Sequence, residues 1–467
     1  MEATSINSLL NENLDGLSKL SAELILIFGS IVLLISGIFG LQRMLQVGLY
    51  GLIIAVAIFF KSTSIGPLFN GDLVVTELGS NVQYLLLFAS LSMMLFRSFW
   101  KRNTEFYFML LAMLTGCMLM VCARNLLLIF LSIELASMPA YIATAFHFRK
   151  KSFEAAIKYL LTGIICSAIM LYGMSLIYGL EGTLLPAGQV SDELLSLVGW
   201  SMLLVGILFK VSVFPAHLWV PATYQVAPTE LVAFFTIVPK IAGFALLLSL
   251  APVLQREWII NILFLAAIAS ILIGTFSALQ QTQVKRMLAY GAIAHSGFLL
   301  PLTMLPDYGS QAFLYYIWVY ALMNIGAFYF VSCFEEKGEL ELARLSGLGQ
   351  MSPIIGGGVV VIMISLVGLP PTAGFSIKLW LFSAVWQAYE ASGNYLYLTF
   401  VVLGILSSAV SLFFYLRVPY YCFMVPSESK ELRSSNWKMA TFMLFFALSL
   451  ILVFAVPDIF DNFILLN

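Results

Sequence analysis

The chain has 467 residues, of which 61% are hydrophobic and only 10% are charged, and its formal net charge at pH 7 is −1. A soluble domain of this size carries about 25% charged residues, so this composition is that of a polytopic membrane protein. The near-neutral charge argues against nucleic acid as a partner, and five scattered cysteines without a C-x-x-C pair argue against a bound metal or iron–sulfur cluster.

A membrane-spanning helix needs about 20 mostly apolar residues. With this window the sequence predicts an all-α polytopic membrane protein with about fourteen spans. The predicted spans lie near residues 22–41, 44–60, 80–97, 105–122, 124–146, 158–179, 197–216, 231–252, 258–278, 286–305, 311–334, 353–389, 397–421 and 438–456. The segment 353–389 is interrupted and long enough for two helices. Whether it counts as one span or two is decided by the orientation of the loops.

Basic residues give that orientation, because inward loops carry an excess of Lys and Arg. With the N-terminus outside, 16 of the 23 Lys and Arg residues fall on the inward side, four on the outward side and three within spans. The inward residues are Arg43, Arg97, Lys101, Arg102, Arg149, Lys150, Lys151, Lys158, Lys285, Arg286, Lys337, Arg344, Arg417, Lys430, Arg433 and Lys438. The outward residues are Lys19, Lys61, Arg124 and Arg256. Two passes through 353–389 would invert every later loop, so we predict one broken span there and both termini outside.

Four charged residues fall inside predicted spans, namely Glu134, Lys210, Lys240 and Lys378. The first three lie roughly 14–20 Å deep at a helix rise of about 1.5 Å per residue, near the middle of a hydrocarbon core about 30 Å thick. Each ionised group costs about 2.5–3.5 kcal/mol at that depth, so partners, water or a function are implied.

A structural ion pair is the simplest alternative for Glu134. One acid cannot neutralise three lysines, however. A buried lysine without a permanent counter-ion can exchange a proton near neutral pH, so a set of such groups at one depth indicates a proton relay.

Two of the lysines stand beside helix breaks. Lys210 precedes the break in LLVGILFKVSVFPAHLWVPATYQVAPTE, and Lys378 follows the break in SLVGLPPTAGFSIKLWLF. The two broken spans, the seventh and the twelfth, are five spans apart and therefore cross the membrane in opposite directions. This is typical of inverted repeats whose broken helices line an ion path, here spans 4–8 and spans 9–13.

The predicted organisation follows from these repeats. It comprises an N-terminal three-helix segment (1–104), a first repeat (105–252), an inverted second repeat (253–421) and a C-terminal helix (422–467).

Three further polar residues are candidates for the path. His295 lies midway along its span, where a neutral imidazole can relay protons or simply hydrogen-bond a neighbour. His217 adjoins Pro215 and is either a gate or an interfacial residue. Lys158 begins its span and either joins the path or extends to the headgroups.

The stretches KVSVFPAHLWVPATYQVAPTE, ALQQTQVKRMLAYGAIAHSGFLL and GLPPTAGFSIKLW resemble the antiporter-like membrane subunits of respiratory complex I. The resemblance covers most of the chain and is strongest from 105 to 420. Three features resemble the N-type group. Lys378 stands where M-type members carry glutamate, the chain ends soon after span fourteen, and the stretch FLSIELASMPAYI is N-like. Many relatives have glycine at Ser376 or Ile377, a difference that leaves Lys378 in register.

The resemblance implies roles for individual positions. Glu134 matches the span-five glutamate of the family, Lys210 the lysine that pairs with it, and Lys240 the lysine of the central relay. Lys378 matches the terminal lysine from which a proton leaves, and Lys158 a further span-six lysine.

The resemblance also implies a proton-translocating subunit of NADH:quinone oxidoreductase in the cell inner membrane, without a cofactor of its own. FMN and iron–sulfur clusters are then expected in partner subunits, with K-, J-, A-, H- and M-type subunits as membrane neighbours. The alternatives are a subunit of a multi-subunit cation/proton antiporter, which should respond to Na⁺ or K⁺, and a membrane scaffold, which should tolerate Lys210→Ala.

Overall fold

The structure is a computed structural model that describes residues 16–62, 64–186, 193–335, 339–426 and 437–457. Three cations of the inward set, Lys337, Lys430 and Arg433, lie outside the described residues. Within those residues, thirteen helices are long and apolar enough to cross a membrane. These helices confirm the predicted helical membrane fold. That the broken pair α15 (Pro353–Val367) and α16 (Ala373–Ser392) makes one fourteenth span stays a prediction.

The helices follow the apolar stretches of the sequence closely. The long helices are α2 (Ser21–Ile38), α3 (Arg43–Phe60), α4 (Glu77–Ser92), α5 (Thr104–Cys122), α6 (Leu126–Thr144), α7 (Lys150–Glu181), α8 (Leu194–Val211), α10 (Thr229–Leu250), α11 (Glu257–Leu279), α12 (Val284–Met304), α13 (Pro306–Phe334), α15 (Pro353–Val367), α16 (Ala373–Ser392), α17 (Tyr395–Tyr415) and α19 (Trp437–Ala455). The short elements are β1 (Gly66–Leu68), η1 (Phe69–Gly71), β2 (Leu73–Val75), η2 (Met93–Leu95), η3 (Phe99–Lys101), α9 (Trp219–Val226), η4 (Leu342–Leu345), α14 (Leu348–Met351) and α18 (Arg417–Phe423). The strands β1 and β2 pair as an antiparallel hairpin.

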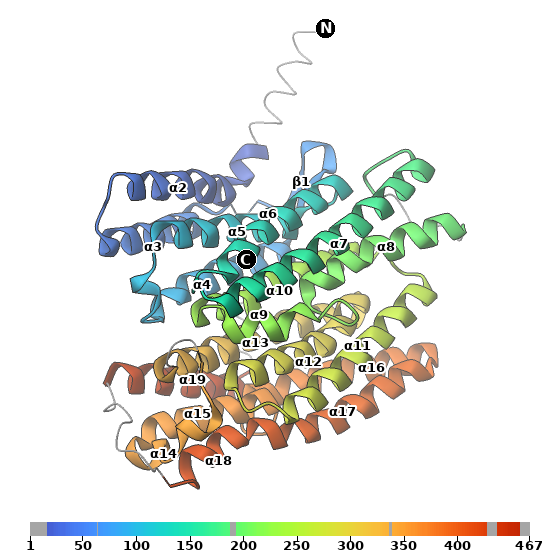
Figure 1. Cartoon of the computed structure of the whole chain (residues 1–467). Coiled ribbons are helices and arrows are strands. Elements are labelled where there is room, and N and C mark those ends of the chain that lie inside the picture. Colours follow the sequence, from blue (N-terminus) through green and yellow to red (C-terminus); the bar gives the residue numbers. More distant parts are fainter. Residues whose placement is uncertain (1–15, 63, 187–192, 336–338, 427–436, 458–467) are drawn as a thin grey trace. The chain divides into compact units, whose positions relative to one another are not determined.

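Internal contacts divide the chain into two units. The first comprises residues 1–211 and 238–256, and the second comprises 212–237 and 257–467. In the first unit α7 packs along α8, and α5 packs against both α2 and α6 (Figure 1). In the second unit α11 packs along α12, α13 packs on α16, and α15 packs on α19. The division into the four predicted segments remains a prediction.

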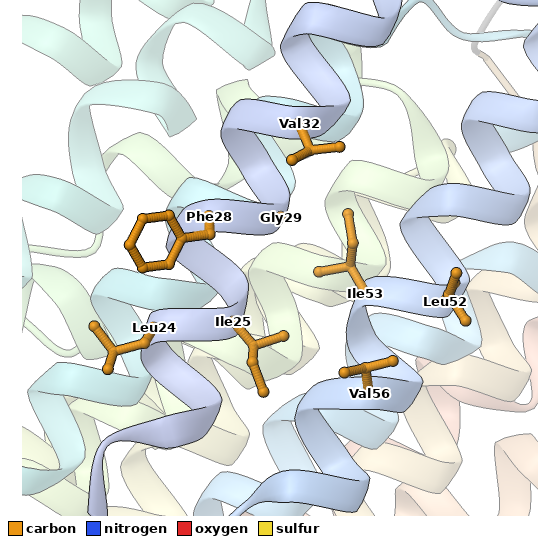
Figure 2. Close-up of a pocket in the computed structure, with 8 residues that line it drawn as sticks. All are labelled: Leu24, Ile25, Phe28, Gly29, Val32, Leu52, Ile53 and Val56. Atoms are coloured by element: carbon orange, nitrogen blue, oxygen red, sulfur yellow. The ribbon is translucent and has the colours of Figure 1, made fainter. Parts of the chain in front are cut away.

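The first two helices of the first unit expose apolar side chains over much of their length, as lipid-facing helices do. An apolar groove between α2 and α3 is lined by residues such as Phe28, Gly29, Leu52 and Ile53 (Figure 2). Gly29 lets the helices approach here, because a Cβ atom at this position would lie 2.5 Å from Ile53 Cγ2. The groove carries no polar side chain and therefore no chemistry.

Both predicted helix breaks are present. The helix α8 ends at Val211, one residue after Lys210, and the chain turns through Ser212 (φ 62°) before α9 begins. The helix α15 ends at Gly368, whose φ of 88° is in the left-handed region that glycine adopts without strain. Each break therefore leaves backbone carbonyl and amide groups without a partner in their own helix, in the middle of an apolar stretch of sequence.

Candidate functional site

Lys210 contacts α6 one turn after Glu134. The Lys210 side chain is 3% exposed, and its Nζ donates a hydrogen bond to Ser137 Oγ at 3.1 Å. Glu134 lies three residues before Ser137 on the same helix, and its Oε1 accepts from Ser167 Oγ of α7 at 2.5 Å. The two charges interact electrostatically. Each end of the expected Glu–Lys pair is thus held by a serine hydroxyl.

Lys240 is a residue of α10, whose next turn lies against the end of α8. It is buried, and Gly243 follows it three residues later on the same helix face. A Cβ atom at Gly243 would lie 2.6 Å from Val211 Cγ1 and 3.7 Å from Lys210 Cγ. This glycine therefore allows α10 to pass close to Val211 and Lys210 at the end of α8, one turn after Lys240.

Lys378 belongs to the second unit and lies at the twelfth-span break. It is the sixth residue of α16 and is 5% exposed. Its Nζ donates to the Val367 carbonyl oxygen at 2.6 Å and to Ser408 Oγ at 3.1 Å. The Val367 carbonyl is at the C-terminus of α15, where the helix dipole favours a cation. The break thus supplies the acceptor that holds the ammonium group.

His295 lies in the second unit within a group of tyrosines. Its Nδ1 is 2.8 Å from the Tyr316 hydroxyl, and its ring centroid is 5.4 Å from that of Tyr320. Tyr415 also reaches this part of α12, because its hydroxyl would collide with a Cβ atom at Gly291. Exchange of protons between the imidazole and a phenol is chemically possible here, since each can donate and accept.

Lys158 and His217 are placed differently from these buried groups. The helix α7 begins at Lys150, so Lys158 lies in its third turn and not at the start of the helix as expected. Its side chain is 60% exposed and pairs with Glu154 at 2.6 Å. His217 belongs to the short segment that follows α8 in the chain and precedes α9; it is buried, with its ring 5.9 Å from that of Phe214. The relay role of Lys158 remains a prediction.

The first unit contains a buried polar cluster that the sequence did not predict. Glu23 of α2 is 4% exposed and accepts a hydrogen bond from Gln83 Nε2 of α4 at 2.8 Å. Lys61, counted above as an outward loop cation, is buried and donates to Ser80 Oγ at 2.7 Å. The signal for it was present, since Glu23 is an acid within the first turn of a predicted span.

A second buried cation was also read as a loop residue. Lys285, at the start of α12, is 1% exposed and donates to the Ala227 carbonyl oxygen at 2.8 Å. Its Nζ is 3.5 Å from Glu335 Oε2, which also accepts from Thr229 Oγ1 at 2.5 Å. These contacts join the end of α9, the starts of α10 and α12, and the end of α13. The hydropathy of the sequence places Lys285 at the end of a span but cannot tell whether its side chain is buried or exposed there.

The chemistry available to these groups is proton exchange. The described residues include no group of three or more His, Cys, Asp or Glu side chains that could hold a metal ion. The buried groups are amines, an imidazole, a carboxylate and hydroxyls, all of which bind or release protons or orient water. Ionisable residues at membrane depth are typical of proton relays in pumps and transporters.

The domain family described as NADH:quinone oxidoreductase/Mrp antiporter matches residues 123–407. The chain is 38% identical over 343 residues to NADH-quinone oxidoreductase subunit N of Trichlorobacter lovleyi, covering 70% of this chain and 69% of that one. It is 33% identical over 465 residues to NADH-quinone oxidoreductase subunit N 2 of Sorangium cellulosum, covering 90% and 91%.

Solved structures give the same result. A chain of respiratory complex I from Thermus thermophilus with bound aureothin matches with a TM-score of 0.81 and 31% identity, covering 94% of this chain and 97% of that one. A chain of the Mrp complex from Dietzia matches with a TM-score of 0.79 over 96% and 95%, but its 17% identity indicates the shared fold alone. The chain therefore belongs to the subunit N family of NADH-quinone oxidoreductases, within the NADH:quinone oxidoreductase/Mrp antiporter family.

Proposed function

We propose that this chain is a proton-translocating subunit of NADH:quinone oxidoreductase, and that it moves protons while other subunits oxidise NADH and reduce quinone. The observation that carries the proposal is the set of three buried lysines at membrane depth, Lys210, Lys240 and Lys378. Two of them donate to neutral oxygen atoms, which hold the protonated amine without fixing its charge permanently. The chain acts in this reaction as part of a translocase and supplies no redox centre.

The path that we propose comprises Glu134, Lys210 and Lys240 in the first unit, and His295 and Lys378 in the second. Lys158 is assigned to the side of the path nearest the inward surface. Protons pass between these groups through hydroxyls and internal water, which can bridge polar groups too far apart for a direct hydrogen bond.

Matching helix contacts support the inverted repeats of spans 4–8 and 9–13. A Cβ atom at Gly116 of α5 would lie 2.6 Å from the Ala136 backbone nitrogen and 2.9 Å from the Ser132 carbonyl oxygen of α6. A Cβ atom at Gly274 of α11 would meet the corresponding atoms of α12 at 2.6 and 2.7 Å. Each position in the second unit follows its counterpart by 158 residues (116 to 274, 132 to 290, 136 to 294). The α5–α6 and α11–α12 pairs are spans 4–5 and 9–10 of the proposed repeats.

Partially exposed charges at membrane depth support neighbouring subunits as partners. Glu134 is only partly buried within this chain, and Lys158 with Glu154 is exposed. Uncovered charges facing lipid are costly, so we assign this face of α6 and α7 to contact with other complex I membrane subunits of the K-, J-, A-, H- or M-type. FMN and the iron–sulfur clusters belong to partner subunits, and the complex resides in the cell inner membrane with both termini of this chain outside.

A cation/proton antiporter subunit is the second candidate function. The Mrp complex from Dietzia shares the fold, but the similarity in sequence is much lower than for the subunit N relatives. An antiporter would move protons against Na⁺ or K⁺ without NADH oxidation, so the two functions predict different results in one experiment.

That experiment measures NADH-driven, quinone-dependent proton uptake in membranes that carry Lys210→Ala, after assembly of the complex is checked. We expect proton uptake and NADH oxidation to fall together, at least tenfold, because the loss of a buried charged group removes one step of the path. Lys101→Ala, which removes an exposed lysine, is the control and should leave both rates unchanged.

Two serine variants on α6 make the measurement more specific. Ser137 and Ser132 both bond a carbonyl of their own helix, but only Ser137 accepts from Lys210. Ser137→Ala should therefore lower proton uptake, and Ser132→Ala should not. Unchanged NADH oxidation in Lys210→Ala with loss of Na⁺/H⁺ exchange would instead identify an antiporter subunit.

A further inference from the structure

An aromatic ring completes the site of Lys378. Besides its bonds to the Val367 carbonyl and the Ser408 hydroxyl, Lys378 Nζ lies 4.8 Å from the centroid of the Phe298 ring. The ring comes from α12, so the ammonium group is held by three helices, α12, α15 and α17. Phe298 itself is 3% exposed.

The same ring also contacts the histidine of the proposed path. Phe298 follows His295 by three residues on α12, so both side chains lie on one face of that helix. Their ring centroids are 6.3 Å apart, at an interplanar angle of 64°. Phe298 is thus in contact with two groups of the proposed path, the amine over its face and the imidazole in a T-shaped ring pair.

Small residues on α17 leave space for this ring. A Cβ atom at Gly404 would lie 2.7 Å from Phe382 Cε1 and 3.3 Å from Phe298 Cε1, so this glycine leaves space for both rings. Ser408 follows Gly404 by one helical turn, and its hydroxyl donates to the Gly404 carbonyl oxygen at 2.9 Å while accepting from Lys378. One face of α17 therefore supplies both the space for the ring and the acceptor for the ammonium group.

The other elements packed against α16 present neutral groups to this region. Within the described part of the chain, its aromatic contacts with α13 and α19 are Tyr315 on Trp380 and Phe454 on Phe375. The α15 groups here are Val367 and Ser365, and Ser365 Oγ accepts from the Gly374 amide. His295 is then the titratable group that shares a contact with the Lys378 site, through Phe298.

An aromatic face attracts a cation through its quadrupole and offers no comparable attraction to a neutral amine. We propose that Phe298 is a positioning residue of the proton path, which stabilises the protonated form of Lys378 and so sets the pH range in which this lysine exchanges a proton. The inference rests on the proposed function, because it concerns the last lysine of that path.

The test uses the intact complex in proteoliposomes, with NADH and quinone, and measures proton uptake between pH 6 and pH 9. Phe298→Leu and Phe298→Met remove the ring but keep an apolar side chain of similar bulk. We expect the alkaline limb of the pH profile to move to lower pH by about 0.4 to 1.5 units, from the range of cation–π energies. Phe298→Tyr keeps the aromatic face and should keep the native profile.

The matched control is Phe264→Leu. Phe264 is buried and packs against the aromatic rings of Tyr397 and Phe400. Among the described residues, none of the cations placed over an aromatic ring is over Phe264. This variant should keep the native pH profile even if its maximal rate falls, because a rate change alone is what lost packing would produce.

The outcomes separate the two proposals. A native complex that oxidises NADH without taking up protons would contradict the proposed function itself. A native complex that does take up protons, with aliphatic variants at Phe298 that follow the native profile, would overturn the positioning role alone. Failure of both aliphatic variants to assemble while Phe298→Tyr assembles would assign the ring to packing and would also overturn it.

Discussion

Neutral oxygen atoms accept hydrogen bonds from three of the buried lysines, whereas a fourth, Lys285, also lies 3.5 Å from the Glu335 carboxylate. Lys61 donates to Ser80, Lys210 to Ser137, and Lys378 to Ser408 and a backbone carbonyl. A hydrogen bond from a charged donor contributes about 1.5–3 kcal/mol, whereas a close carboxylate in a buried site stabilises the charged form much more strongly. Hydroxyl and carbonyl partners therefore leave the energies of the charged and neutral amine close enough for exchange.

Lys61 lies outside the spans, and its protonation can be followed through the stability of its site. Burial lowers its pKa, and the Glu23 carboxylate opposes part of the shift. An unfolded or opened segment therefore binds the Lys61 proton more tightly than the folded one does. The native site gains stability as pH rises from the lowered folded value towards about 10.4, the value of an exposed lysine.

Cys122 reports local opening of this site, because its buried Sγ lies 3.1 Å from Gln83 Nε2. We predict that the rate at which a thiol reagent labels Cys122 in the native complex, divided by the rate in Lys61→Gln, falls as pH rises towards about 10, the pKa of an exposed lysine. Division by the variant removes the intrinsic pH dependence of the thiol. A ratio that rises with pH would contradict the sign of the burial effect.

At the scale of the elements, a glycine closes the twelfth-span break. A Cβ atom at Gly374 would collide with the carbonyl group of Ser365 on α15. The contact is with backbone, which cannot turn aside as a flexible side chain can, so α15 and α16 have to separate. The Lys378 site depends on this closure, because Val367 and Lys378 come from the two halves of the break.

We therefore predict that Gly374→Ala destabilises the chain by about 1–3 kcal/mol and lowers the amount of assembled complex. Gly357→Ala is the matched control on α15, since no atom lies within 4 Å of the added Cβ and alanine is the better helix former. Assembly is measured as the ratio of this subunit to the flavin of the purified complex. Equal assembly of the two variants would show that the break tolerates separation.

The sequence predicted the helices well where the signal was the length of an apolar stretch, and the breaks where it was a charge within such a stretch. Lys210 and Lys378 were assigned to breaks, and the structure places them at the end of α8 and beside the end of α15. It failed for Lys61 and Lys285, because side chains at helix ends are buried or exposed according to tertiary packing. The serines that hold the lysines were not identifiable either, since hydroxyls that bond their own helix are common in any span.

For the whole molecule, the proposed repeats require an odd offset between the two breaks. Each half contains one glycine contact of the Gly116 or Gly274 kind and one lysine beside a broken helix. Repeats related by an axis in the membrane plane run in opposite directions. Whether the number of spans between two loops is odd or even then decides whether they lie on the same side of the membrane. The orientation of two loops therefore tests the whole topology.

We predict that Lys101→Cys is protected from a membrane-impermeant thiol reagent added outside cells or right-side-out vesicles, and that Ser392→Cys is labelled. Both positions are exposed within this chain, so burial does not decide the result. They lie on opposite sides because twelve spans precede Ser392, whereas three precede Lys101, and an odd number separates them. Inverted vesicles should reverse the pattern. Labelling of both positions from one side would require 353–389 to cross the membrane twice, and the two lysine-bearing breaks would then no longer be related by inverted repeats.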